Sequence, residues 1–210
     1  MMVEAMPHCR LYLTLPVRPS AALESSLAQA LAEADVACVL LCNDMAPIDN
    51  SWAFRLRELT LAREIAFLIE NDAPRAETIG ADGIHITADV ALYRSARDKL
   101  GQLAIIGVGC IESRHDAMTM AELGADYVAF GHAEANETAC ELRVELIAWW
   151  SEIFVAPCVA WDVETAEEAE RLAGLGADFI ALSTAIWQAE DVAQRIATIG
   201  AALRRARTAA

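Results

Sequence analysis

Eight short apolar segments recur along this chain, and a helical pattern follows each of them. The segments are Leu11–Leu15, Ala37–Leu41, Ile65–Ile69, Gly83–Ile86, Leu103–Gly107, Tyr127–Phe130, Val155–Ala160 and Phe179–Leu182. Most are apolar at every position, which is typical of parallel strands covered on both faces. Eight such units in 210 residues predict one α/β domain over residues 1–210, a (β/α)8 TIM barrel. A doubly wound open sheet is the alternative, but no Gly-x-Gly-x-x-Gly follows the first segment.

A Gly-Ala-Asp phrase occurs three times, each time between a predicted helix and the next strand. The three copies are Gly80–Asp82, Gly124–Asp126 and Gly176–Asp178. Glycine suits the position after a helix end, because it adopts positive φ without a Cβ clash. The aspartate then falls at the amino-terminal end of a strand, the face of a barrel that serves stability. We expect these aspartates to bind backbone groups. Ser20, Ser51 and Thr165 are the predicted helix N-caps.

Composition limits the classes of molecule that this protein is expected to bind. Asp and Glu outnumber Lys and Arg by 31 to 16, a net charge of −15, which argues against nucleic acid and anionic membranes. A small phosphorylated substrate is compatible with this negative charge, since backbone N–H groups can bind phosphate locally. There is no apolar run of roughly 18 residues and no signal-peptide pattern at the start, so we expect a cytoplasmic protein. The six cysteines form no Cys-x-x-Cys pair, which favours reduced thiols.

Function in a barrel belongs to the loops after the carboxyl ends of the strands. Asn71 and Asp72 follow the third predicted strand, and Asp89 follows the fourth. Mg²⁺ accepts one or two carboxylates together with water and substrate phosphate. We therefore predict Asp72 and Asp89 as magnesium ligands, with helix capping as the alternative. Ser183 and Thr184 precede a helix start after the eighth strand, where they are predicted to bind phosphate or simply to cap that helix.

Two histidines are candidates for chemistry. His132 follows Phe130-Gly131 at the end of the sixth predicted strand, where its imidazole can face the pocket and titrate near neutral pH. His85 alternates with Ile84 and Ile86, so it is expected inside the barrel, as a structural histidine or in contact with substrate. Trp149 and Trp150 offer a face for a homodimer, although packing on the barrel is favoured.

These phrases, taken together and in order, resemble the thiamine-phosphate-synthase and thiazole-tautomerase superfamily over nearly the whole chain. The matching segments are Leu11–Thr14, Leu68–Asp72, Gly80–Ile86, Ile106–Cys110, Gly124–Gly131 and Gly176–Ile186. The resemblance implies a barrel that joins a pyrimidine diphosphate to a thiazole phosphate and releases pyrophosphate, with Mg²⁺ as cofactor and phosphorylated heterocycles as substrates. It also implies that Asn71, Gly109 and Gly131 lie in the substrate site beside His85.

The sequence departs from the family pattern at several predicted site positions. Where the family has Gln-x-Arg-x-Lys, this chain has Leu40–Asp44, which contains no cation. The second metal carboxylate falls on Val90, with Asp89 adjacent, and the expected serine is Gly109. Trp161-Asp162 replaces the Gly-Gly that approaches the thiazole phosphate. Loss of donors to a departing pyrophosphate should slow the synthase reaction, so a degenerate site with weak or altered activity is the favoured prediction.

Two alternatives remain open at this point. The tautomerase branch needs no pyrophosphate site and uses a histidine after Phe-Gly, which Phe130–His132 matches. A relative without catalytic activity, binding a ligand or a partner chain, would also keep the fold-forming phrases and lose the site-forming ones.

Overall fold

A computed structural model describes residues 9–16, 18, 20–43, 49–131 and 137–209. Eight parallel strands close into a barrel in chain order, and β1 pairs with both β2 and β8. The strands are β1 Arg10–Leu15, β2 Val36–Leu41, β3 Ala66–Glu70, β4 Gly83–Thr87, β5 Ile105–Ile111, β6 Tyr127–Phe130, β7 Cys158–Val163 and β8 Phe179–Leu182. The predicted (β/α)8 barrel is confirmed.

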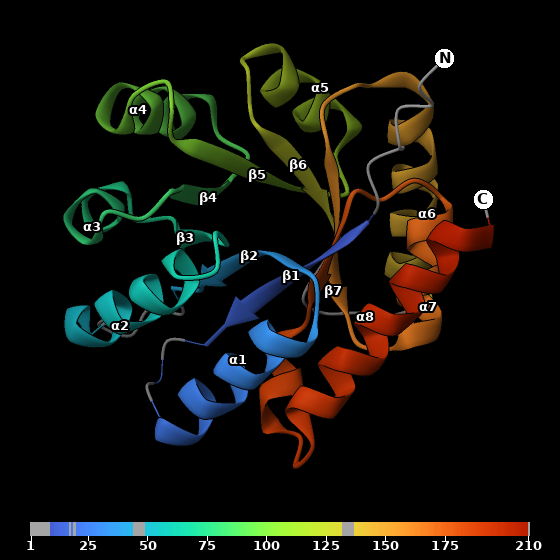
Figure 1. The fold of residues 1–210 in the computed structure, drawn as a ribbon. Coiled ribbons are helices and arrows are strands. Elements are labelled where there is room, and N and C mark those ends of the chain that lie inside the picture. Colours follow the sequence, from blue (N-terminus) through green and yellow to red (C-terminus); the bar gives the residue numbers. More distant parts are fainter. Residues whose placement is uncertain (1–8, 17, 19, 44–48, 132–136, 210) are drawn as a thin grey trace, which may run out of the picture.

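The helices surround the strands on the outside (Figure 1). They are α1 Ala21–Glu33, α2 Asn50–Leu61, α3 Ala73–Ile79, α4 Val90–Leu100, α5 Arg114–Glu122, α6 Glu137–Ile153, α7 Ala166–Gly174 and α8 Val192–Ala209. A 3-10 helix, η1 Thr184–Gln188, precedes α8. None of the helices, as far as they are described, is both long and apolar enough to cross a membrane.

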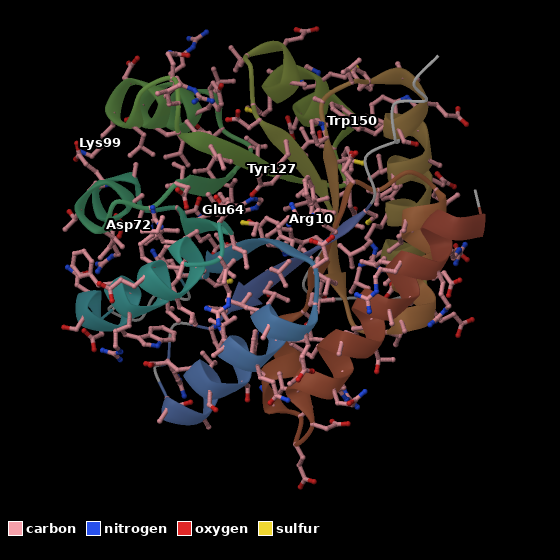
Figure 2. The ribbon with its side chains drawn as sticks, in the orientation of Figure 1. Arg10, Glu64, Asp72, Lys99, Tyr127 and Trp150 are labelled. Carbon is pink, nitrogen blue, oxygen red and sulfur yellow. The ribbon has the colours of Figure 1, made fainter. Side chains whose placement is uncertain are left out.

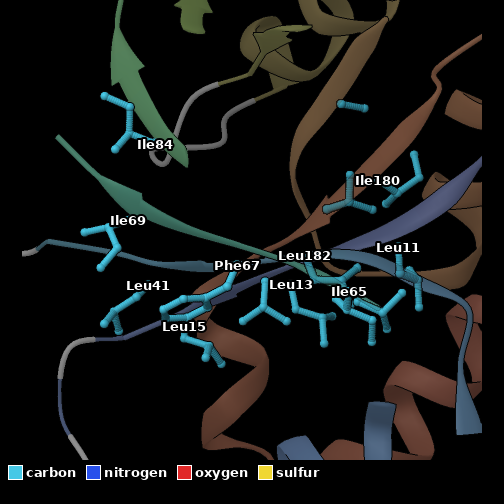
Figure 3. Packing of buried hydrophobic residues seen from close by; sticks show 14 of the residues in the cluster. Leu11, Leu13, Leu15, Leu41, Ile65, Phe67, Ile69, Ile84, Ile180 and Leu182 are labelled. Carbon is cyan, nitrogen blue, oxygen red and sulfur yellow. The ribbon is translucent and has the colours of Figure 1, made fainter. Parts of the chain in front are cut away.

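The apolar strands divide their side chains between two clusters. Along β1, Leu11, Leu13 and Leu15 pack outward against the helices, as Figure 3 shows, whereas Tyr12 points into the barrel. The other strands alternate in the same way, because successive strand residues face opposite sides of a sheet. Continuous apolarity therefore reflects two buried faces, as the sequence predicted.

The three Gly-Ala-Asp phrases stabilise the amino-terminal face of the barrel. Each glycine has positive φ, between 69° and 100°, which suits the end of a helix. Each aspartate accepts a hydrogen bond, 2.8 Å long, from a backbone N–H of the preceding strand. The pairs are Asp82 with Phe67, Asp126 with Ile106, and Asp178 with Cys158. The expectation that these aspartates bind backbone groups is confirmed.

Some predicted boundaries were wrong. The predicted strands Leu103–Gly107 and Val155–Ala160 lie further along the chain, at Ile105–Ile111 and Cys158–Val163. Leu103 and Val155 are fully exposed, so their apolarity reflects the surface of the amino-terminal face and not a strand. The N-cap of α2 is Asp49, whose carboxylate accepts from the N–H of Ser51, and not Ser51 itself.

The two adjacent tryptophans of α6 pack on the barrel. Trp150, labelled in Figure 2, is 1% exposed. Its indole N–H donates to the carbonyl of Ala156 at 2.7 Å, and its ring stacks on Phe154. Trp149 is partly buried, with the guanidinium of Arg114 over its ring. Packing on the barrel, which the sequence favoured, is confirmed for Trp150, and the homodimer stays a prediction.

Candidate functional site

A buried chain of hydrogen bonds crosses the interior of the barrel. The hydroxyl groups of Tyr12 and Tyr127 lie 2.9 Å apart, and the Tyr127 hydroxyl lies 3.0 Å from Nδ1 of His85. The three residues come from β1, β6 and β4, and Figure 2 shows Tyr127 among the strands. The inward position predicted for His85 is confirmed. The two tyrosines were missed, although alternation along their strands could have revealed them.

These three side chains are held in their neutral forms. Burial lowers the pKa of His85 to about 3, because desolvation penalises the imidazolium. Burial likewise raises the pKa of Tyr12 and of Tyr127 well above that of an exposed tyrosine. At neutral pH the interior is therefore polar but uncharged, and His85 cannot act there as a cationic acid.

Two glycines of β5 make room for this chain. A Cβ atom on Gly107 would lie 1.8 Å from Cζ of Tyr127, so the tyrosine ring occupies the space of a missing side chain. A Cβ atom on Gly109 would lie 3.1 Å from Nε2 of His85. The structure thus places the predicted substrate-binding residue Gly109 against His85, and its contact with a substrate stays a prediction.

The indole of Trp161 lies over the polar chain at the carboxyl end of β7. It stacks on His85, with ring centroids 4.5 Å apart and planes 14° apart, and it tilts against Tyr12 at 5.4 Å. The register of β7 with β8 shifts between Ala160 and Val163, and Asp162 has φ 62°. This bulge turns the backbone so that Trp161 points inward.

A buried arginine fixes the same backbone from outside the barrel. Arg143 of α6 is 3% exposed; it donates to the carbonyl of Trp161 and to that of Asp162, and it pairs with Glu168 of α7. No sequence signal indicates this role, because Arg143 lies between two glutamates on a helix, where a charged side chain is normally exposed to solvent. Gly131 packs against the same backbone, since a Cβ atom on it would lie 2.7 Å from the Trp161 carbonyl oxygen, and its predicted contact with substrate stays a prediction.

Asn71 joins the carboxyl ends of β3 and β4. Its backbone N–H donates to the carbonyl of His85 at 2.9 Å, and its side-chain oxygen accepts from the N–H of Thr87 at 3.2 Å. Its φ of 50° is one that asparagine tolerates better than most residues. The preceding residue, Glu70 of β3, accepts with its carboxylate from the N–H of Asn43, which follows the neighbouring β2, at 2.8 Å. Asn71 therefore lies at the mouth, as predicted, and its role toward a substrate stays a prediction.

The carboxylates predicted to hold Mg²⁺ cap helices. Asp72, the N-cap of α3, accepts from the N–H of Arg75 at 2.9 Å and pairs with its guanidinium at 3.0 Å, beside α3 in Figure 2. Asp89, the N-cap of α4, accepts from the N–H of Leu92 at 2.7 Å. Among the described residues, no three His, Cys, Asp or Glu side chains converge on one point. Both carboxylates therefore cap helices in this structure, and magnesium binding by Asp72 and Asp89 stays a prediction.

Ser183 and Thr184 lie where β8 passes into η1. The Ser183 hydroxyl is buried and accepts from the N–H of Ala185 at 3.3 Å, whereas Thr184 is exposed. The capping alternative is thus present for Ser183, and phosphate binding by either hydroxyl stays a prediction. The predicted catalytic His132 lies outside the described residues, as does Asp44 at the end of the second predicted strand.

Together these features define a (β/α)8 barrel whose carboxyl-terminal mouth lies over a buried chain of Tyr and His side chains. The sequence profile described as thiamine monophosphate synthase matches residues 11–186. A thiamine-phosphate synthase of Rhodospirillum centenum is 40% identical over 87% of this chain and 91% of its own. A thiamine-phosphate synthase of Hyphomonas neptunium is 35% identical over 88% and 89%. The chain belongs to the thiamine monophosphate synthase family.

Solved structures agree on the fold. A thiamine phosphate pyrophosphorylase from Pyrococcus furiosus superposes with a TM-score of 0.76 at 20% identity, covering 93% of this chain and 96% of its own. A 3-hexulose-6-phosphate synthase from Salmonella typhimurium superposes with a TM-score of 0.72 at 15% identity, covering 93% of this chain and 99% of its own.

Family membership implies phosphorylated heterocycles as substrates, and members of the family typically use Mg²⁺.

Proposed function

We propose that this protein binds a phosphorylated heterocycle at the carboxyl-terminal mouth of its barrel and forms thiamine phosphate slowly or not at all. The reaction expected of the family expels pyrophosphate, and electrostatic stabilisation of that anion is its main requirement. The observation that carries the proposal is the charge at the end of β2. The segment Leu40–Asp44 has no cation, and the adjacent Glu70 carboxylate binds the N–H of Asn43.

Two of the arginines described near the carboxyl ends of the strands are already paired with carboxylates. Arg75 contacts Asp72, and Arg143 contacts Glu168 and two backbone carbonyls. Moving either guanidinium to a pyrophosphate would leave a carboxylate without its partner. One missing donor to a developing anion costs about 3 kcal/mol, so two missing cations should slow the reaction by at least about a thousandfold.

Magnesium should bind only together with a diphosphate. Asp72 and Asp89 stay predicted ligands, and since both carboxylates cap helices we expect Mg²⁺ alone to leave Tm unchanged. Pyrophosphate with Mg²⁺ should raise Tm if the mouth retains any diphosphate site. A ligand at about 100 times its Kd adds roughly 2.7 kcal/mol of stability.

The test is a steady-state assay of thiamine phosphate formation from the pyrimidine diphosphate and the thiazole phosphate, with Mg²⁺ titrated. The Rhodospirillum centenum relative, assayed under the same conditions, is the reference. We expect a kcat/KM at least about a thousandfold lower for this protein. A value within tenfold of the reference would refute the proposal, and the protein would then be an ordinary synthase.

A thiazole tautomerase is the second candidate, favoured by the phrase Phe130–His132. Proton transfer needs one group of suitable pKa and no pyrophosphate site, so the missing cations do not count against it. Tautomerisation of thiazole carboxylate phosphate that His132→Asn abolishes would establish this function. Thermal shifts with a thiazole phosphate, without turnover in either assay, would indicate a binding protein.

A further inference from the structure

Trp161 separates the mouth of the barrel from the polar chain beneath it. The inward-facing side chains at the end of β7 are Val159 and then Trp161, so the indole is the outer of the two. His85, Tyr12 and Tyr127 are 5%, 1% and 6% exposed, whereas Trp161 is partly exposed. A planar molecule entering from the mouth therefore meets the indole before it can meet His85.

The position of Trp161 is fixed from several sides. The bulge of β7 and the positive φ of Asp162 aim the side chain inward. Arg143 donates to the Trp161 carbonyl, and the absence of a Cβ on Gly131 lets that carbonyl approach β6 closely. A non-glycine residue at positive φ is uncommon and persists where its surroundings hold it. The orientation of the indole is thus fixed by the packing of the barrel.

We infer that Trp161 is a specificity-determining residue that closes the inner barrel to ring ligands. A heteroaromatic ring then stacks on the outer face of the indole, where offset stacking of planar rings is favourable. The ligand ring does not reach the edge of His85 or the hydroxyls of Tyr12 and Tyr127. These groups would otherwise form hydrogen bonds with its donors and acceptors. The identity of the ring ligand rests on the proposed function, whereas the closure does not.

Chemical modification of His85 measures the closure directly. Diethyl pyrocarbonate acylates neutral imidazole, and peptide mass spectrometry separates His85 from the exposed His115, which serves as an internal reference. In the wild-type protein we expect His85 to react at least tenfold more slowly than His115. Trp161→Gly should bring the two rates within threefold, and Trp161→Phe, which keeps a stacked ring, should remain like wild type.

Matched variants keep the test decisive. Trp149→Gly removes a partly buried indole of α6, which lies under the guanidinium of Arg114, and should leave the His85 rate unchanged, which excludes general loosening as the cause. Should Trp161→Gly fail to melt cooperatively, Trp161→Leu replaces it, with an expected rise of at least threefold. A folded Trp161→Gly or Trp161→Leu protein with His85 as protected as in wild type would overturn the inference.

Binding of two ring probes then tests specificity. By calorimetry, we expect Trp161→Gly to bind a hydroxymethylpyrimidine phosphate at least tenfold more tightly than Trp161→Phe, because the ring can enter the inner barrel. Equal affinities would overturn the specificity role. If His85 becomes reactive in Trp161→Gly while no variant binds this probe or a thiazole phosphate, the closure is supported and the proposed ligand class is refuted.

Discussion

Lowering the pH from 7.5 to 5.0 should destabilise this protein through His85. The imidazole is 5% exposed, and burial lowers its pKa to about 3 in the folded protein, against about 6.5 in an unfolded chain. Between these two values the unfolded state binds a proton that the folded state excludes, so stability falls as the pH falls. The loss begins near pH 6.5 and grows down to about pH 3.

The size of the effect follows from the two pKa values. At pH 5.0 an unfolded histidine is almost fully protonated, and the linkage relation gives a loss of about 2 kcal/mol relative to pH 7.5. Most of this loss would remain if the folded pKa were one unit higher, because pH 5.0 would still lie above it. The prediction therefore depends on the burial of His85 and little on the value of its pKa.

Urea unfolding at pH 7.5, 6.0 and 5.0 measures this loss. The comparison is between the wild-type protein and His85→Asn, which removes the titrating imidazole and keeps a polar side chain. The pH dependence of the variant should be smaller by about 2 kcal/mol, while carboxylates titrate alike in both proteins and cancel. His115→Asn, at an exposed position, should behave as wild type. An equal pH dependence in wild type and His85→Asn would refute the reasoning.

Four further substitutions test the contacts that hold the barrel together, by urea unfolding. Gly107→Ala should lower the free energy of unfolding by about 1–3 kcal/mol, since its Cβ would overlap the Tyr127 ring. A loss below about 0.5 kcal/mol would mean that the ring can move away at little cost. Asp178→Ala should cost about 1–3 kcal/mol by leaving a strand N–H without its acceptor, and it should not change ligand affinity. Arg143→Met should cost about 3 kcal/mol by breaking a buried ion pair. Glu168→Gln, which retains an acceptor for that guanidinium, should cost less, and the opposite order would contradict the assigned contacts.

The fold could be predicted because each local signal repeats. The eight apolar segments and the three Gly-Ala-Asp phrases each indicate the same strand-and-helix unit. An error in one predicted boundary therefore does not change the predicted architecture. The misplaced strands illustrate the limit. Leu103 and Val155 look like strand residues but lie fully exposed at the amino-terminal face, and hydrophobicity alone does not distinguish these two environments.

The site could be predicted only in part, because its residues meet through the closure of the barrel. Alternation along β4 placed His85 inside, yet its partners Tyr12 and Tyr127 come from strands far away in the sequence. Capping explains why Asp72 and Asp89 were ambiguous: the residue types that bind Mg²⁺ after a strand also begin the next helix. Arg143 could not be found at all, since a charged residue among glutamates on a helix gives no sign that its end is buried against β7.

The two faces of this barrel carry different parts of the prediction. The three aspartates that tie neighbouring strands together lie at the amino-terminal ends, where their hydrogen bonds contribute to stability. The positions where the sequence predicts a departure from the family pattern, among them Leu40–Asn43 and Trp161-Asp162, lie at the carboxyl-terminal ends. Replacement there is compatible with the barrel provided the new residues are packed, as Trp161 is by His85 and Arg143. Family membership consequently fixes the architecture of this protein, whereas its chemistry has to be tested at the mouth.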